Sequence, residues 1–484
     1  MILERVKQLK EKLNNSFDVV IREIVCGNKN INVIFVKSVV DEDFFISGIL
    51  SPIMDYAKLN KIENKNVSLD ILINEVLKTV DVGKVSENEI VDSINEHKVI
   101  IFIEGEKEAL AIDISNYTVR MPTEPPTSAV MKGPREGFVE DYKHNISMLR
   151  RRFAADKLAM DSMKIGRYSK TDVAIAYIKG ITDKKLVKDV KKKLEQIDID
   201  GIVDSHYLIS FLQGKKSTMF KQVGNYEKPD VVASKLLEGR VAIIINNSPI
   251  VLTLPFLLLE DLQNSNDYYS LHYHASYIRV IRLLGVLMAV ALPGIYVSLR
   301  LYHYNVMPLN FLMTIGNASR MIPFTPFVEI FFILILFEIL YEVSLRLPRY
   351  FGLATSIVGA LILGETGVRA GLISSPGVMI IALSVIAAYT VPDQVDQISL
   401  LRMIFLILGA GLGIFGIIAG VVFIIAYLNN MDSYGSPYLA PVSPFIKSDL
   451  KDSIIKYRTS NMRTRPKSIK NSNKVRVKHD KKSD

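Results

Sequence analysis

Residues 403–431 read MIFLILGAGLGIFGIIAGVVFIIAYLNNM and carry no charged side chain over 29 positions. At a helical rise of about 1.5 Å per residue, such a run is longer than the ~30 Å hydrocarbon layer of a bilayer. Two further uncharged runs, 283–299 and 370–392, lie in the same part of the chain. Because buried helices of soluble proteins rarely extend this far without a polar face, residues 280–431 predict an integral membrane protein.

The remainder of the chain is charged, and its composition narrows the class of protein. The 484 residues carry a formal net charge of +9, and residues 447–484 alone hold 13 Lys and Arg against 4 Asp. Beside a membrane span, such a tail indicates the cytosolic side and anionic lipid, so nucleic acid is not the expected partner. Cys26 is the only cysteine, which excludes an intrachain disulfide. The start, MILERVKQLKEKL, is a charged amphipathic pattern unlike a signal peptide, so we expect the N-terminal region and the tail to be cytosolic.

The first part of the chain predicts an α/β fold made of two related subdomains. A strand, two helices and a hairpin follow one another in residues 1–120 and again in 161–279, with a Pro-rich linker and basic helix at 121–160 between them. Chance likeness between common α/β parts is the competing explanation. The expected fold is therefore an α/β cytosolic region, followed by an α-helical transmembrane domain at 280–431 and a basic cytosolic tail at 432–484.

Charged residues of the linker are candidate contacts with another subunit, or contacts used in gating. Arg135 and Glu136 follow a Gly-Pro turn, and Arg150-Arg151-Arg152 form one cationic turn of the predicted helix. Spacing alone favours a plainer alternative, in which the arginines of a solvated linker helix face water.

Several motifs occur in a fixed order along the chain. In the α/β region they are Glu124-Pro125-Pro126, Gly133 to Glu140, Asn145-Ile146-Ser147, Arg150-Arg151-Arg152, Lys170 to Val173, Ile197 to Ile202, Glu227 to Asp230 and Leu237 to Ala242. In the membrane half they are Pro323 to Glu329, Phe337 to Leu340, Arg346-Leu347-Pro348, Ile357 to Leu361 and Gly435 to Tyr438. Together they resemble the GerA family, the A subunits of bacterial spore nutrient germinant receptors, over about residues 120 to 445. A paralogous sporulation membrane protein shares this layout, so receptor subunit and paralogue both stay open.

The resemblance implies a subunit of the spore inner membrane that acts with a permease-like B subunit and a lipoprotein C subunit. It also implies a homo-oligomer in the lipid bilayer that encloses a nutrient-gated ion channel. An ion-coupled secondary transporter and a scaffold that conducts nothing are the alternatives. The sequence has no phosphate loop, metal-ligand cluster or nucleophile elbow, so we expect no enzyme, no cofactor and no metal.

Acidic residues in the second predicted span are candidates for an ion pathway. Glu338, Glu342 and Arg346 recur every four residues and share one helical face. An isolated carboxylate within a bilayer costs about 2.5 kcal/mol or more, so this face must meet water, protein or a counter-ion. A structural pair between Glu342 and Arg346 is the alternative.

The segment 351–370 combines small residues with Glu365, which would suit an ion path if several copies surrounded an axis. Its other candidates are Thr355, Ser356, Gly359 and Leu363. Further along the chain, Gly409, Gly413, Gly416 and Gly420 are expected to be helix-packing residues.

The sides on which the two chain ends lie determine whether the number of membrane crossings is even or odd. The apolar stretches are 280–302, 328–347, 351–370, 377–391 and 403–428, with 305–327 expected at the interface. Two cytosolic ends require an even number of crossings, whereas the five stretches are odd in number. We predict that 377–391, which is short for a span, does not cross.

Overall fold

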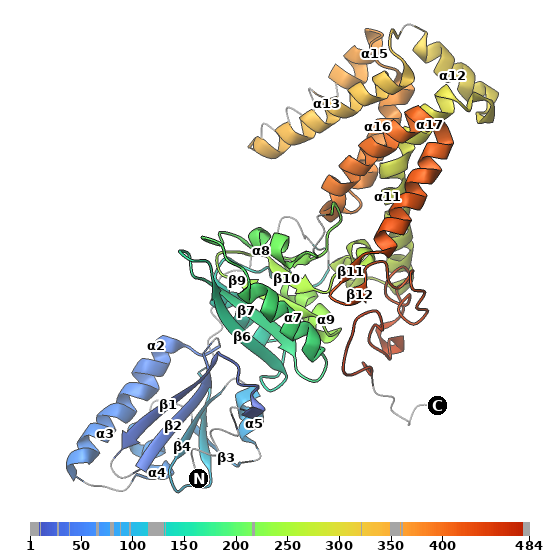
Figure 1. Ribbon diagram of the computed structural model, residues 1–484. Coiled ribbons are helices and arrows are strands. Elements are labelled where there is room, and N and C mark those ends of the chain that lie inside the picture. Colours follow the sequence, from blue (N-terminus) through green and yellow to red (C-terminus); the bar gives the residue numbers. More distant parts are fainter. Residues whose placement is uncertain are drawn as a thin grey trace. The chain divides into compact units, whose positions relative to one another are not determined.

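The computed structural model divides the chain into two compact units (Figure 1). The α/β unit comprises residues 1–257, 432–436 and 460–484, and the helical unit comprises 258–431 and 437–459. The described residues are 9, 11–26, 29–37, 39–63, 67–77, 82–87, 89–95, 98–114, 130, 132–214, 218–320, 322–348, 359 and 362–477. The helical unit begins before the predicted boundary at 279/280, because the short helices before the first long helix pack with it.

The first α/β subdomain is built on a five-stranded antiparallel sheet. The strands are β1 (Val19–Cys26), β2 (Lys29–Val36), β3 (Val82–Val85), β4 (Val99–Ile103) and β5 (Ala109–Ile112). They lie in the order β1-β2-β4-β5-β3. β4 is a continuous run of β-branched and aromatic residues and is buried along its whole length. The predicted hairpin of β4 and β5 is confirmed, since Val99 pairs with Ile112.

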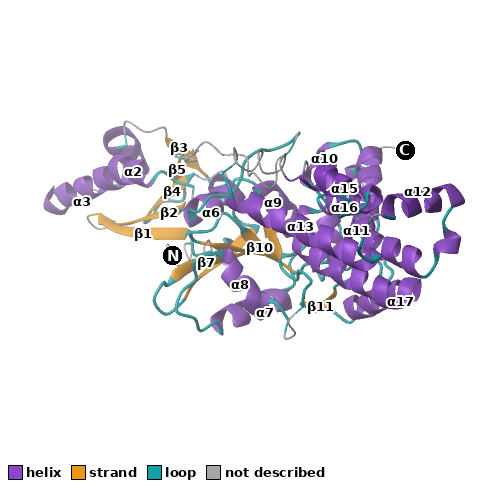
Figure 2. Ribbon diagram, turned by 90° about the horizontal axis from the view of Figure 1, so that it is seen from above, coloured by secondary structure: helices purple, strands orange, loops and turns teal. Residues whose placement is uncertain are grey.

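Helices cover both faces of this sheet. One face carries α2 (Glu42–Phe44), the π-helix Phe45–Leu50, α3 (Ser51–Glu63) and α4 (Leu69–Ile71). Ser68 caps the start of α4, because its Oγ accepts a hydrogen bond from the backbone N–H of Ile71 at 3.4 Å. The other face packs against α5 (Ile90–Asn95), Leu9 and Leu13. Figures 1 and 2 show α3 lying alongside β1.

The second subdomain repeats this plan. Its strands are β6 (Leu158–Ile165), β7 (Thr171–Ile178), β8 (Gly224–Tyr226), β9 (Val241–Ile245) and β10 (Val251–Leu254). One face packs against α7 (Lys184–Glu195) and α8 (Ser205–Leu212), the other against α6 (Tyr142–Arg150) and α9 (Pro229–Leu237). The order β6-β7-β9-β10-β8 matches that of the first sheet, strand for strand in chain order. The predicted pair of related α/β subdomains is therefore confirmed.

The outer strands of both sheets were not predicted from the sequence. β6 begins at Leu158, inside the stretch assigned to the linker and basic helix, and that helix ends at Arg150. Because β6 is an edge strand, its second half alternates partly buried with exposed residues and includes Asp161 and Lys164. A strand with so little apolar alternation gives a weak signal.

A buried ion pair joins the two subdomains within the α/β unit. Arg150 is 0% exposed, and its guanidinium donates hydrogen bonds to both carboxylate oxygens of Asp18, at 2.9 and 2.7 Å. It also donates to the carbonyl oxygen of Leu158 at 2.7 Å. A charge removed from water is stable only when it is paired and hydrogen-bonded. The plainer alternative of a water-facing arginine therefore does not hold for Arg150.

We predict that Arg150→Ala destabilises the chain by about 3–5 kcal/mol, because it leaves the Asp18 carboxylate buried without its counter-charge. Arg151→Ala is the matched control, since Arg151 is partly exposed, and we expect it to cost less than about 1 kcal/mol. Thermal unfolding of both full-length variants in detergent measures the difference. Equal losses in the two variants would contradict this role of Arg150.

The helical unit holds the apolar half of the chain. Its helices are α10 (Ser265–Tyr269), α11 (His272–Leu301), α12 (Leu309–Ser319), α13 (Pro326–Arg346), α15 (Gly367–Arg369), α16 (Ser375–Ala388) and α17 (Val395–Asn429). Val297 of α11, Ile333 of α13, Ile381 of α16 and Leu406 of α17 belong to one buried core. α12 lies in the stretch that we expected at the interface.

The long helix α17 reverses direction at Gly413. This glycine has φ 62° and ψ −147°, a conformation that L side chains rarely adopt. A Cβ placed on Gly420 would lie 3.3 Å from the ring of Phe405, whereas residues 15 apart in a straight helix are separated by ~22 Å. α17 is thus a helical hairpin, and the single span predicted at 403–428 is corrected to two antiparallel legs. Gly413 is the turn between them, not a packing residue along one helix.

The hairpin changes the predicted topology. Because its two antiparallel legs bring the end of α17 back toward its start, this stretch does not count as a single crossing, and the parity argument no longer requires the removal of 377–391. α16, which occupies that stretch, packs along α11, and Ser384 Oγ donates to the carbonyl oxygen of Ala289 at 2.7 Å. The physical reason for the difference is that only the backbone at Gly413 divides the uncharged run.

The basic tail is folded over its described residues, 432–477. In the helical unit, Arg279 of α11 donates to the carbonyl oxygen of Asp452 at 2.6 Å. In the α/β unit, Arg465 donates to the carbonyl oxygen of Leu237 at 2.8 Å, and Ile469 is buried. The tail is therefore a structural part of both units.

We predict that cysteines placed at Asp396 and Asn430 react with an impermeant reagent from the same side of the membrane, and that one at Leu412 reacts from the other. All three side chains are exposed, and the native Cys26 is buried. Labelling in sealed vesicles of known orientation measures the sides. Reaction of positions 396 and 430 from opposite sides would contradict the hairpin.

Polar clusters and the candidate ion pathway of the helical unit

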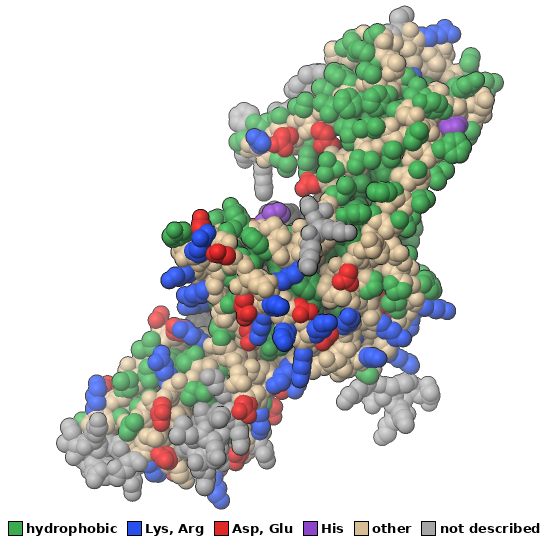
Figure 3. Space-filling view, viewed as in Figure 1, with side chains coloured by type: hydrophobic (Ala, Val, Ile, Leu, Met, Phe, Trp, Pro, Cys, Tyr) green, Lys and Arg blue, Asp and Glu red, His purple; other side chains and the backbone are tan. Residues whose placement is uncertain are grey.

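Two helical stretches among the described residues are long and apolar enough to cross a membrane, His272–Leu301 and Pro392–Asn429. The second is the stretch that folds back at Gly413. Figure 3 shows hydrophobic side chains over most of the visible face of the helical unit, whereas charged side chains gather on the α/β unit.

Glu338 of α13 is held by two residues of α17. Ser399 Oγ donates to Glu338 Oε1 at 2.5 Å, and the guanidinium of Arg402 lies 3.9 Å from the same oxygen. Arg402 is buried and also donates to the carbonyl oxygen of Ala289 at 3.0 Å. The side chain of Glu338 remains 36% exposed. This carboxylate is thus fixed on one side and accessible on the other, an arrangement that sequence spacing did not suggest.

The other predicted acidic residues are paired on exposed surface. Glu342 accepts a hydrogen bond from Arg346 at 2.8 Å, and Glu365 lies 2.8 Å from Arg369. All four side chains are well exposed in the single chain. The structure therefore brings none of the three candidate glutamates together within one copy.

The small-residue segment is described only in part. Thr355 and Ser356 lie outside the described residues, and for Leu363 only the backbone is described. A Cβ on Gly359 would lie 2.9 Å from the Leu340 side chain of α13, so this glycine permits close packing within the chain. A Cβ on Gly364 would meet open space.

The glycines of α17 permit close contacts inside the helical unit. A Cβ on Gly409 would overlap the backbone of Gly294 in α11, which brings these two helices together. Gly416 and Gly420 face the first leg of the hairpin, against Leu408 and its neighbours.

A buried cluster centred on Glu329 was not among the predicted site residues. Glu329 is 1% exposed and lies 2.9 Å from Arg300, at the end of α11. It also accepts hydrogen bonds from the backbone N–H of Ser374, at 2.8 Å, and from its hydroxyl. An arginine at the end of one span and a glutamate at the start of the next could have indicated this pair, which links α11, α13 and the start of α16.

A second cluster surrounds Asp267 at the start of α11. Asp267 is 3% exposed and accepts hydrogen bonds from Arg279 at 2.9 Å and from Arg282 at 2.8 and 2.9 Å. Burial acts to raise the pKa of Asp267, but the hydrogen bonds and positive charges of Arg282 and Arg279 outweigh it and lower the pKa below its ordinary value. The cluster fixes the short helix α10 to α11.

The candidate contacts of the linker lie in the α/β unit. Glu136 pairs with Arg151 and, at 2.6 Å, with Arg152, while Arg135 is exposed. Burial acts to raise the pKa of Glu136, but Arg152 and Arg151 lower it. In this chain the Glu136 carboxylate is thus the intramolecular partner of two of the four predicted arginines.

We predict that Asp267→Asn destabilises the chain at neutral pH by at least about 3 kcal/mol, because buried Arg279 and partly buried Arg282 lose the carboxylate that they share. A carboxylate whose folded pKa is lowered stabilises the fold above its ordinary value of 3.8 and stops doing so as the pH falls through the folded value. The difference from wild type should therefore shrink below about pH 4. Thermal unfolding against pH measures it, with Asp200→Asn, at an exposed pair with Arg167, as the control. A difference that persists at low pH would refute the assignment.

Comparisons with known proteins identify relatives over nearly the whole chain. The family model described as Bacillus/Clostridium GerA spore germination protein matches residues 7–468. Spore germination protein KA of Bacillus subtilis is 34% identical over 485 residues, covering 98% of this chain and 88% of its own. The uncharacterized membrane protein YfkQ of Bacillus subtilis is also 34% identical, over 469 residues, 95% of this chain and 90% of its own.

Among solved structures, the N-terminal domain of the A subunit of the Bacillus megaterium spore germinant receptor GerK3 is 30% identical, with a TM-score of 0.38, covering 51% of this chain and 92% of that chain. The family match and the relatives extend over both units, including the helical hairpin and most of the tail. This chain belongs to the GerA family of spore germination proteins.

Proposed function

We propose that the chain is the A subunit of a germinant receptor in the spore inner membrane, and that copies of it form a cation channel gated by nutrient. It would act with a permease-like B subunit and a lipoprotein C subunit, with its N-terminal region and tail in the cytosol. Family membership supports the receptor role. The apolar helices and the charged α/β unit support a membrane protein with a large aqueous module.

One observation supports conduction in particular. Glu338 carries a carboxylate on a helix of the apolar unit, and Ser399 and Arg402 hold one of its oxygens while more than a third of the side chain stays accessible. An acidic side chain exposed at membrane depth requires water, protein or a cation. In an oligomer each such carboxylate is repeated around the axis, which raises the local concentration of cations.

The exposed pairs of α13 and of the small-residue segment fit the same proposal. Glu342 and Glu365 each have an arginine four residues further along the helix. In a single chain these pairs face outward, so a neighbouring copy is a natural source of further contacts. The open space beside Gly364 would also allow a close approach.

We predict that Glu338→Gln slows the release of monovalent cations from spores after nutrient addition by about tenfold or more, because the repeated negative charge is lost. Glu106→Gln, a change in the α/β unit, is the matched control and should leave release unchanged. Ion release and the amount of each variant in the membrane are measured together. Wild-type release at normal protein levels in Glu338→Gln, Glu342→Gln and Glu365→Gln would remove the pore assignment.

Purified full-length protein separates the alternatives. Discrete current steps in a planar bilayer favour a channel, and slow saturable ion uptake into vesicles favours a coupled transporter. The absence of both indicates a scaffold that only assembles with the other subunits.

A further inference from the structure

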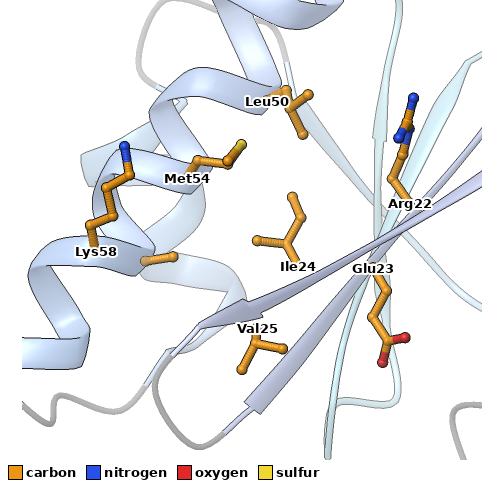
Figure 4. Close-up of a pocket in the computed structure, with 8 residues that line it drawn as sticks. Arg22, Glu23, Ile24, Val25, Leu50, Met54 and Lys58 are labelled. Atoms are coloured by element: carbon orange, nitrogen blue, oxygen red, sulfur yellow. The ribbon is translucent and has the colours of Figure 1, made fainter.

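An open groove runs between the edge strand β1 and helix α3 (Figure 4). It encloses about 420 Å³, and its lining includes Ile24 and Val25 of the strand together with Met54 and Ala57 of the helix. Met54 is 44% exposed, and Ile24, on the face of β1 that packs against α3, is partly buried. The groove therefore presents apolar surface to solvent on the α/β unit.

The strand beside the groove has a free edge. β1 pairs with β2 along its whole length, and in the described part of the chain no strand pairs with its other side. The outward backbone N–H and C=O groups of such an edge are a template for another strand. Extended peptides bind edges of this kind by adding a strand, and their alternate side chains enter the adjoining pockets.

In the second subdomain, a side chain of the edge strand β6 closes the equivalent groove. Cys26 ends β1 and Ile165 ends β6, so the fifth residue from the end is Arg22 in one strand and Asp161 in the other. Asp161 forms an ion pair with Lys191 of α7 at 2.8 Å, which ties that strand to its helix. Arg22 makes no ion pair with any residue that the structure describes.

The helix side differs in the same way. When Ile53 is aligned with Val190, buried Ile53 and Ala57 of α3 match buried Val190 and Leu194 of α7, and buried Ile49 of the preceding π-helix matches Leu186. This alignment places Met54 where α7 has Lys191, and Ala57 where it has Leu194. The first subdomain therefore lacks both the closing ion pair and the bulky side chain. The groove is open because of these substitutions, although the two folds are alike.

We propose that the groove binds an extended segment of a different protein, which adds as a strand beside β1. An apolar side chain of that segment occupies the hollow over Ala57, and an acidic side chain on the same face pairs with Arg22. Lys58, at the rim of the groove, forms an exposed ion pair with Asp55 at 3.5 Å, so Arg22 is the positive charge on which the proposal rests. The proposed ligand is thus a peptide strand with alternating exposed and inserted residues, one of them acidic.

A second copy of this chain fits the edge poorly. Two identical antiparallel strands related by a two-fold axis place each residue opposite one of equal parity. The two registers with the greatest overlap of Val19–Cys26 therefore set Arg22 opposite Arg22, or Glu23 opposite Glu23. Like charges directly opposite one another destabilise a sheet. This argument selects a partner of different sequence, and it does not depend on ion conduction.

The test uses the full-length chain in nanodiscs and a fluorescein-labelled peptide, TVTLTDTV, blocked at both ends. We expect saturable binding by fluorescence anisotropy, weakened at least tenfold by Arg22→Glu and by Ala57→Leu, the residue of the closed groove. The peptide TVTLTKTV should bind Arg22→Glu better than wild type. TVPLPDTV should not bind, because proline has no backbone N–H to pair with β1. Lys188→Glu on the exposed face of α7 is the matched control.

Three results would overturn the proposal. The first is no saturable binding of TVTLTDTV to the wild-type chain. The second is binding that both Arg22→Glu and Ala57→Leu leave unchanged. The third is an assembly of Arg22→Glu chains that is smaller, by light scattering, than the wild-type assembly, because the groove would then hold a second copy of the chain. Cation release from spores that carry these variants tests the channel proposal separately. Normal release together with any of the three results would overturn the peptide proposal alone.

Discussion

Glu329 is almost completely buried in the helical unit, and its carboxylate is held by Arg300 of α11 and by Ser374 at the start of α16. Apolar helices can slide or rotate against one another at little cost, but a buried charge is stable only where its counter-charge lies. The contacts of Glu329 with Arg300 and Ser374 therefore fix α11, α13 and the start of α16 in one arrangement. Further along, the contact of Glu338 with Ser399 fixes α13 to α17, and that of Arg402 with the Ala289 carbonyl oxygen fixes α17 to α11.

The α/β unit also depends on a buried charge that is paired with its counter-charge. Arg150 and Asp18 are buried together between two subdomains whose sheets have the same strand order. Because the two subdomains share one fold, residues at equivalent positions can be compared directly. Where the second subdomain joins Asp161 to Lys191, the first has Arg22 and Met54 and leaves a groove beside a free strand edge. We interpret the first subdomain as the copy that has kept or gained a binding surface.

The two proposals concern separate parts of the molecule. Conduction requires carboxylates that stay accessible in an apolar unit, and Glu338 has this property because its partners occupy only one of its sides. Partner binding requires exposed apolar surface and free backbone groups, and the edge of β1 offers both. A receptor subunit needs both kinds of surface, one facing ions and lipid and one facing other proteins.

The sequence by itself determined the class of the protein: the uncharged runs predicted the membrane-like helices, the repeated strand and helix patterns predicted two α/β subdomains, and the ordered motifs identified the family. It also located Glu338 as a candidate. Only the tertiary structure decided that Ser399 and Arg402 hold this residue, that Glu329 pairs with Arg300, and that α17 turns back at Gly413. Periodicity and composition report the environment of each segment, because burial depends on local pattern. Which distant charge lies opposite, and where a uniform apolar run reverses, depends on contacts between segments far apart in the chain.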